Sequence, residues 1–175
     1  MADAALRVGI VTVSDRASRG EYDDLSGPAV QAALATLLVS DWMPVVECVP
    51  DDRGRIEQVL VRLADDEQCH LVLTTGGTGP APRDVTPEAT AAVCDRLLPG
   101  FGEAMRAASL ERVPTAMLSR QTAGRRGTCL MVNLPGKPTA AAECLAVVMP
   151  AIAHFVALLG GPRVDLSQPT IAPHD

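Results

Sequence analysis

The sequence predicts one α/β domain with three layers, α/β/α, built around a mostly parallel sheet. Apolar runs at residues 8–13, 43–49, 70–75 and 128–134 alternate with segments of helical periodicity. Such continuous apolar runs are typical of strands that are covered on both faces. Strict alternation of strands and helices implies parallel pairing through right-handed crossovers. With 175 residues and 47% apolar content, the chain is long enough for one well-buried core and short for two.

The first predicted strand, residues 8–13, ends at Ser14. A polar segment follows, and Ser26 with the glycine and proline after it predicts a helix start. The next residues repeat at helical spacing: Val30, Ala33, Leu34, Leu37 and Leu38. The second strand, residues 43–49, carries Pro44 near its beginning, where a missing N–H is tolerated.

The next helix is predicted from apolar residues on one face: Ile56, Val59, Leu60 and Leu63. The third strand, residues 70–75, leads into a glycine-rich loop. Thr86, Pro87 and Glu88 then carry three helix-start signals, and this helix is predicted to run to Leu97 or Leu98. Pro99 and Gly100 are predicted to break it, with another short helix before Pro114.

Residues 118–127 have no clear period and are predicted to form a loop or turn. The last strand, residues 128–134, stops at Pro135. A final helix over residues 145–159 is predicted to close the core, kinked or split at Pro150. Residues 1–161 are thus expected to form the domain, and the proline-containing tail, residues 162–175, to lie over its surface or to be mobile.

Composition excludes several classes of protein. A net charge of -6 and only four aromatic residues (two Phe, one Tyr, one Trp) argue against general binding of nucleic acid. Five widely spaced cysteines without a Cys-x-x-Cys pair, and a start without a secretory signal, predict reduced thiols in the cytoplasm. The longest apolar stretch falls short of the roughly 20 residues of a membrane helix, so we expect no membrane span.

Polar residues fall where the predicted strands end, at residues 14–16, 51, 76–84 and 133–137. In open α/β sheets the carboxyl ends of the strands form the ligand crevice. We therefore expect these four stretches to converge on one site.

The glycine-rich loop is the most specific of them. Gly76, Gly77 and Gly79 allow positive φ and close approach of the backbone, so the N–H groups of residues 76–79 can bind phosphate oxygens. The alternative is a simple tight turn, since the loop matches neither the P-loop nor the dinucleotide-binding spacing. Asp84 beside a phosphate suggests a cation such as Mg²⁺ between them, although it could also cap the next helix or pair with Arg83.

The other stretches keep structural alternatives. Asp51 and Asp52 lie between a strand and a helix, where a turn or N-cap residue is common. Residues 14–16 have the same ambiguity, and residues 133–138 could be a rigid turn. Ser119 has no nearby His and Asp in sequence, so it does not resemble an acyl-transfer nucleophile. The cysteines are expected to be packing residues.

Taken together, residues 74–90, 13–16, 99–103, 118–120 and 133–136 resemble the molybdopterin adenylyltransferase family of molybdenum-cofactor biosynthesis, of the MogA/MoaB type. The resemblance spans residue 7 to about residue 159. It implies a molybdopterin-binding α/β fold, a homotrimer, and adenylylation of molybdopterin by Mg-ATP with release of pyrophosphate. A hand-over of product to a molybdate-insertion protein would follow.

The resemblance also implies roles for residues. Asp51 and Asp84 match the family's acidic pair and would hold Mg²⁺ for catalysis. The implied substrate-binding residues are Ser14, Asp15, Arg16, Gly76, Gly77, Thr78, Gly79, Ser119, Asn133, Pro135, Gly136 and Lys137. Some members carry an extra loop after the Asn-Leu-Pro-Gly turn, whereas this chain runs from Lys137 directly into a helix.

Three other functions compete with this one. A protein of the same fold could bind molybdopterin or a related pterin without transferring an adenylyl group, but both acids being present favours the enzyme. The molybdate-inserting activity generally belongs to a longer, multidomain chain. A nucleotide-dependent oxidoreductase is disfavoured because the dinucleotide-binding spacing is not met.

Overall fold

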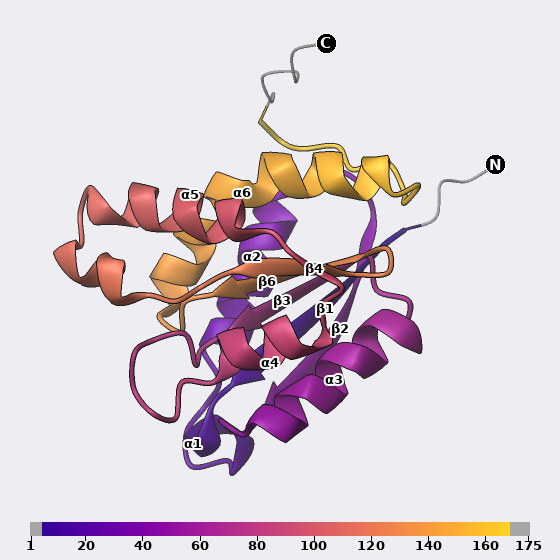
Figure 1. The fold of residues 1–175 in the computed structure, drawn as a ribbon. Coiled ribbons are helices and arrows are strands. Elements are labelled where there is room, and N and C mark those ends of the chain that lie inside the picture. The colour runs from indigo at the N-terminus through magenta and orange to yellow at the C-terminus, as the bar shows by residue number, and fades with distance from the viewer. Residues whose placement is uncertain (1–4, 169–175) are drawn as a thin grey trace.

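The computed structural model describes residues 5–168 and contains a six-stranded sheet with helices on both faces (Figure 1). The strand order is β2-β1-β3-β6-β5-β4. The parallel strands are β1 (Leu6–Val13), β2 (Trp42–Val49), β3 (Leu71–Thr75) and β6 (Cys129–Leu134). β5 (Ala123–Arg126) is antiparallel to β6 and to the two-residue β4 (Arg96–Leu97). The predicted three-layer, mostly parallel fold is confirmed.

The helices divide between the two faces of the sheet (Figure 1). One face is covered by α2 (Ser26–Leu37), α5 (Pro99–Leu110) and α6 (Pro138–Leu158). The other is covered by α3 (Arg53–Asp65) and α4 (Thr86–Val93). Two short helices, α1 (Asp15–Ser18) and the 3₁₀ helix η1 (Pro114–Leu118), lie in connections.

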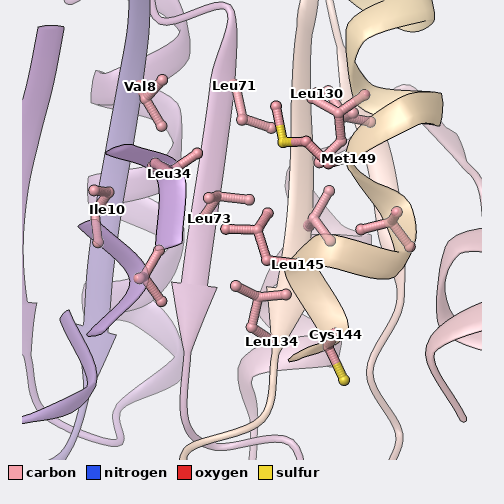
Figure 2. Close-up of a cluster of buried hydrophobic side chains, with 14 of the residues drawn as sticks. Val8, Ile10, Leu34, Leu71, Leu73, Leu130, Leu134, Cys144, Leu145 and Met149 are labelled. Atoms are coloured by element: carbon pink, nitrogen blue, oxygen red, sulfur yellow. The ribbon is translucent and has the colours of Figure 1, made fainter. Parts of the chain in front are cut away.

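Two apolar clusters, one on each face, explain why the strands lack polar alternation. In β1, Val8 and Ile10 pack with α2 and α6 in the first cluster, whereas Val11 belongs to the second cluster beneath α3. Figure 2 shows Leu71 and Leu73 of β3 in the first cluster beside Leu145 of α6, and all three are fully buried. Burial of each such side chain stabilises the fold by roughly 1.5–3 kcal/mol, so both helical layers hold the sheet.

The helix that begins at Thr86 ends earlier than predicted. α4 stops at Val93 because Cys94 adopts an extended backbone, and Arg96 and Leu97 pair with β5 instead of continuing the helix. The N–H of Asp95 also donates to the Arg125 carbonyl at 2.7 Å. The predicted end at Leu97 or Leu98 is wrong, because sheet hydrogen bonds replace the helical ones there.

Two further predictions in this region are corrected. Pro99 and Gly100 begin α5 rather than merely breaking the preceding helix, since proline suits the first helical turn. The loop predicted over residues 118–127 contains β5. A Cβ on Gly124 would lie 2.6 Å from the Cys94 sulfur, so β5 fits beside α4 because glycine stands at this position.

α6 is one helix of 21 residues with Pro150 inside it, so the predicted split does not occur. By length and apolar composition alone it could cross a membrane. It instead packs as a core helix in this fold, and the following side chains are buried: Ala141, Cys144, Leu145, Val148, Met149, Ile152 and Val156.

The part of the tail within the described residues, 162–168, lies against the molecule. The N–H of Val39 donates to the Asp165 carbonyl at 2.8 Å, and the N–H of Ser167 donates to the Leu37 carbonyl at 2.9 Å. Leu166 packs against the first apolar cluster. The rest of the predicted tail, residues 169–175, lies outside the described residues, as do residues 1–4.

Candidate active site

The carboxyl ends of four parallel strands meet at one edge of the sheet, as the sequence predicts. Strand pairing aligns Val13 with Val49, and Thr75 with Leu134. The residues that follow are joined as well, since the N–H of Ser14 donates to the Val49 carbonyl at 2.9 Å. The four polar stretches therefore follow the strands at the same end of the sheet, and we call the region between them the crevice.

Asp15 and Asp51 form a reciprocal pair across the ends of β1 and β2. The N–H of Asp15 donates to Oδ2 of Asp51 at 2.8 Å, and the N–H of Asp51 donates to Oδ1 of Asp15 at 3.1 Å. Charge-assisted hydrogen bonds of this kind are stronger than neutral ones. Each carboxylate thus fixes the backbone that carries the other.

The structure separates Asp51 from its neighbour Asp52. Asp52 is the N-cap of α3, and its side chain accepts a hydrogen bond from the N–H of Arg55 at 2.8 Å. Ser14 has the same capping role for α1, where its hydroxyl accepts from the N–H of Ala17 at 3.2 Å. Ser14 and Asp52 therefore act as N-caps, the structural role that the sequence leaves open for them. Asp51 instead bonds to the backbone of Asp15.

Arg16, predicted to contact substrate, stacks on an aromatic ring. Its guanidinium carbon lies 5.1 Å from the centroid of the Tyr22 ring. The structure therefore does not join Arg16 to the Asp15 and Asp51 pair.

The loop after β3 requires glycine at two successive positions. Gly76 has φ 102° and Gly77 has φ 64°. A Cβ on Gly76 would overlap the carbonyl oxygen of Val13, and a Cβ on Gly77 would overlap the hydroxyl of Thr86. That hydroxyl donates to the Gly76 carbonyl at 2.9 Å, so it fixes the turn from inside the protein.

Three successive backbone N–H groups in this loop are not used by the fold. Within residues 5–168, the N–H of Gly76 donates to the Leu134 carbonyl, whereas those of Gly77, Thr78 and Gly79 have no acceptor. Thr78 itself is buried, and its carbonyl accepts from the N–H of Arg120 at 2.8 Å. A run of free N–H groups on a glycine loop is what a phosphate requires.

Asp84 lies at the end of the same loop, which folds back on it. Its Oδ2 accepts a hydrogen bond from the N–H of Ala81 at 3.0 Å. A Cβ on Gly79 would lie 2.8 Å from Oδ2 of Asp84, so the missing side chain makes room for this carboxylate.

Arg83 connects the Asp84 loop to the Asp15 and Asp51 pair. Its guanidinium forms an ion pair with the Asp15 carboxylate and donates to the Asp51 carbonyl at 3.3 Å. The sequence suggests Arg83 only as a partner for Asp84. The structure instead pairs it with Asp15 and with the Asp51 backbone, so the residue next to Asp84 in the chain is held at the ends of β1 and β2.

Arg120 holds the same loop from the other side. Its Nε donates to the Gly79 carbonyl at 2.8 Å, and its Nη2 donates to the Asp84 carbonyl. It also forms an ion pair with Glu88 of α4. The hydrogen bond from the Arg120 guanidinium to the Glu88 carboxylate lowers the pKa of Glu88.

Ser119 and Asn133, both predicted to bind substrate, lie differently. The Ser119 hydroxyl donates to Oε1 of Gln121 at 2.6 Å. Asn133 is fully buried, and its amide donates to the hydroxyls of Thr74 and Thr90. Asn133 therefore joins β6 to β3 and α4, while its buried Oδ1 has no hydrogen-bond partner within residues 5–168.

The turn after β6 is fixed by two hydroxyls. Thr75 donates to the Pro135 carbonyl at 2.8 Å, and Ser26 at the start of α2 donates to the Gly136 carbonyl at 2.7 Å. Lys137 is exposed at the N-cap of α6. It lines, with Pro135, a cavity of about 350 Å³ between α5, η1 and α6.

Sequence reasoning thus misses the residues that hold the crevice in shape. Arg83 stands inside the central motif and Arg120 directly follows Ser119, so their position beside predicted site residues is the available signal. No such signal in the sequence points to Asp24. It accepts from the Thr12 hydroxyl at 2.6 Å and from the N–H of Ser26 at 3.0 Å, and these contacts exist only in the folded chain.

Asp51 and Asp84 have the type of ligand atom that Mg²⁺ prefers. Asp51 and Asp84 each use Oδ2 for a backbone N–H, which leaves one oxygen on each carboxylate. No group of three or more His, Cys, Asp or Glu within residues 5–168 could hold a metal by itself. Magnesium commonly takes one or two carboxylates together with phosphate oxygens and water, so two acids suffice.

The chain is similar to known proteins of molybdopterin biosynthesis over most of its length. The family described as "Probable molybdopterin binding domain" matches residues 9–154. A molybdopterin adenylyltransferase of Helicobacter pylori is 51% identical over 166 residues, covering 95% of this chain and 94% of the relative. One of Escherichia coli is 46% identical over 179 residues, covering 95% and 92%.

Solved structures show the same similarity. The molybdopterin biosynthesis enzyme MoaB of Thermus thermophilus superimposes with a TM-score of 0.82 at 46% identity, covering 90% of this chain and 98% of that one. The Mog protein of Mycobacterium ulcerans gives a TM-score of 0.82 at 35% identity, covering 89% and 100%.

Proposed function

The chain belongs to the molybdopterin adenylyltransferase family, and from that we propose that its crevice binds molybdopterin and Mg-ATP and releases pyrophosphate. The activity is that of a nucleotidyltransferase of molybdenum-cofactor biosynthesis. The observation that carries the proposal is the loop after β3. Three of its N–H groups have no acceptor within residues 5–168, and Arg83, next to Asp84 in the chain, donates to the Asp51 carbonyl.

The proposed reaction is one displacement at phosphorus. An oxygen of the terminal phosphate of molybdopterin forms a bond to the α-phosphorus of ATP. The bond between that phosphorus and the bridging oxygen to the β-phosphate breaks, and pyrophosphate leaves with the electron pair. Both reactants are anions, so catalysis consists mainly of positioning them and stabilising the developing charge.

The protein's own groups divide that work. The N–H groups of Gly77, Thr78 and Gly79 bind phosphate oxygens without adding a flexible cation. The turn at Pro135 and Gly136, held by hydroxyls, forms the facing wall. Lys137, exposed beside the cavity between α5 and α6, supplies a positive charge to the phosphorylated end of a substrate.

Asp51 and Asp84 would hold Mg²⁺ through their remaining carboxylate oxygens. When bound there, the ion supplies charge neutralisation between the two anionic substrates. Asp15 supports this arrangement, because its carboxylate fixes the Asp51 backbone and neutralises Arg83.

The test is synthesis of the product. We expect the protein, given molybdopterin, ATP and Mg²⁺, to form adenylylated molybdopterin and pyrophosphate in equal amounts. Asp84→Asn keeps the size of the side chain but loses its charge, and should lower the rate at least roughly 100-fold. Asp66→Asn, at the exposed C-cap of α3, is the matched control.

Two results would contradict the proposal. An Asp84→Asn protein that works at the wild-type rate would remove the metal role of this acid. Binding of molybdopterin without any pyrophosphate would instead support a pterin-binding protein of the same fold.

The assembly is proposed to be a homotrimer. Exposed apolar side chains on the connection from α5 through η1 support burial against other subunits: Leu110, Val113, Met117 and Leu118. Light scattering should then give three times the 18.3 kDa of one chain, whereas a monomeric mass would contradict the trimer.

The setting follows from the chemistry. The product is an activated, phosphorylated pterin, and we propose that it is handed over to a protein that inserts molybdate. We also propose that the reaction takes place in the cytoplasm, where free thiols such as Cys69 and Cys129 stay reduced.

A further inference from the structure

One guanidinium, that of Arg120, contacts both the loop after β3 and the first turn of α4. It donates to the carbonyls of Gly79 and Asp84, at the two ends of the loop that carries the metal-binding acid. It also forms an ion pair with Glu88 in the first turn of α4. In addition, the backbone N–H of Arg120 donates to the Thr78 carbonyl at 2.8 Å.

The planar guanidinium of arginine, with its five N–H donors, can make all of these hydrogen bonds together. A carbonyl at each end of a loop and a carboxylate beyond it lie in different directions, and the guanidinium can donate to all of them at once. A lysine ammonium has the charge but lacks the fixed fork. The Arg120 contacts therefore set the shape of residues 79–84 and not only their electrostatic environment.

Arg120 is less exposed than Arg83, the other arginine that joins this loop to the rest of the fold. The Arg83 side chain is 68% exposed, whereas that of Arg120 is 37% exposed. Exposed ion pairs contribute little because solvent screens them and the long side chain loses entropy. Glu88 also lies in the first turn of α4, where the helix dipole favours its ionised form and so strengthens its ion pair with Arg120.

We propose that Arg120 is a positioning residue for adenylyl transfer, which holds residues 79–84 so that Asp84 stays opposite the pair formed by Asp15 and Asp51. The guanidinium binds backbone carbonyls of the loop and leaves the Asp84 carboxylate to the metal. Its catalytic consequence rests on the proposed function, whereas its effect on the loop does not.

The experiment compares three variants with one control. Arg120→Ala removes the guanidinium, Arg120→Lys keeps only its charge, and Glu88→Gln removes only the ionic partner. The control is Arg7→Lys, because Arg7 forms a comparable ion pair with Glu67 at the amino end of β1, with 34% of its side chain exposed.

The kinetic expectation separates positioning from general stability. Arg120→Ala and Arg120→Lys should both lower kcat by roughly 10- to 100-fold and raise the Mg²⁺ concentration needed for half-maximal rate. Glu88→Gln should have a smaller effect in the same direction. Free guanidinium ion at millimolar concentration should partly restore the Arg120→Ala rate, and Arg7→Lys should match the wild type.

The second readout is hydrogen exchange of the loop without substrates. The N–H groups of Ala81 and Asp84 are hydrogen-bonded within the loop and should be protected in the wild type. In Arg120→Lys, exchange in peptides covering residues 79–88 should rise roughly tenfold, with no comparable change elsewhere.

Each outcome decides between the proposals. Unchanged exchange together with an unchanged Mg²⁺ dependence in both Arg120 variants would overturn the positioning role. A lower rate that Arg120→Lys restores fully would show that only the charge matters, and would also overturn it. If the wild type forms no product but loop exchange still rises, the proposed function fails while the structural part of this inference stands.

Discussion

Asp51 and Asp52 are adjacent in the chain and do different things in the fold. Asp52 caps α3, whereas Asp51 bonds to the backbone of Asp15 across the sheet. The residue pattern places an acid at the end of β2 and the resemblance selects Asp51, but neither explains why Asp51 rather than Asp52 reaches Asp15. That choice depends on the register of β1 against β2, which aligns Val13 with Val49.

Asn133 is a residue for which the sequence suggests a ligand contact and the structure shows internal hydrogen bonds. A polar side chain at the end of a strand suggests a ligand contact, and the resemblance reinforces that interpretation. In the structure it is fully buried against Thr74 and Thr90. Only the packing of α4 over β3 and β6 reveals this internal role, and Asn133 as a substrate contact stays a prediction.

Gly76 offers a test of how rigid the loop after β3 is. An alanine there would be strained by its positive φ and would also overlap the Val13 carbonyl. Gly160 has φ 75° but no atom within 4 Å of the position that a Cβ would take, so Gly160→Ala isolates the cost of the φ angle, about 1–2 kcal/mol. Gly76→Ala should lower the free energy of unfolding by about 1–3 kcal/mol more.

Urea unfolding of the two glycine variants provides the measurement. Equal losses would show that the loop can move away from Val13. The larger loss for Gly76→Ala would show instead that the loop is rigid in the absence of substrate.

At the scale of elements, the long apolar strands and amphipathic helices were predictable, while β4 and β5 were not. β5 has the sequence Ala-Gly-Arg-Arg and lacks apolar alternation. It is a strand because it pairs with β6 and because Arg126 forms an ion pair with Asp65 of α3. Such distant partners leave no periodic signal in the sequence. The predicted helix over α4 is too long for the same reason.

The start of β3 should make the stability of the sheet dependent on pH. His70 bonds on both sides, since its N–H donates to the Arg7 carbonyl and its own carbonyl accepts from the N–H of Leu130. Burial lowers the pKa of His70, and its Nδ1 accepts from the N–H of Arg7 at 3.1 Å. The neutral imidazole is therefore the form that the fold favours.

The lowered pKa of His70 makes the free energy of unfolding depend on pH. A lowered pKa in the folded state gives stability that is fully present above the unfolded pKa of about 6.5 and is lost as the pH falls through the folded value. The difference in free energy of unfolding between the wild type and His70→Gln should therefore shrink below about pH 6.5. Urea titrations at several pH values measure it, and a difference that grows on acidification would contradict the assignment.

For the whole molecule, the two-sided core predicts how its thiols react. Cys69, Cys129 and Cys144 are buried, Cys94 is intermediate, and Cys48 is exposed on β2. Burial raises the pKa of the Cys129 thiol, and burial raises the pKa of Cys94 to about 11. Thiolates are the reactive form, so both should resist alkylation at neutral pH.

We expect iodoacetamide to modify Cys48 first in the folded protein and all five cysteines after denaturation. Mass spectrometry of the peptides gives the order. If Cys129 reacted as fast as Cys48, the second apolar cluster would have to open far more readily than its burial implies.

The turn after β6 determines when the crevice can exist at all. The Ser26 hydroxyl bonds to the Gly136 carbonyl across 110 residues of sequence, and the Thr75 hydroxyl bonds to the Pro135 carbonyl across 60. Contacts between such distant residues form slowly, because long loops must close before they gain any stabilisation. During synthesis the chain must therefore leave the ribosome to a point well beyond Gly136 before the turn after β6 can bond to Ser26 and Thr75. Nascent chains that stop earlier should bind neither substrate, which makes substrate binding a late event of co-translational folding.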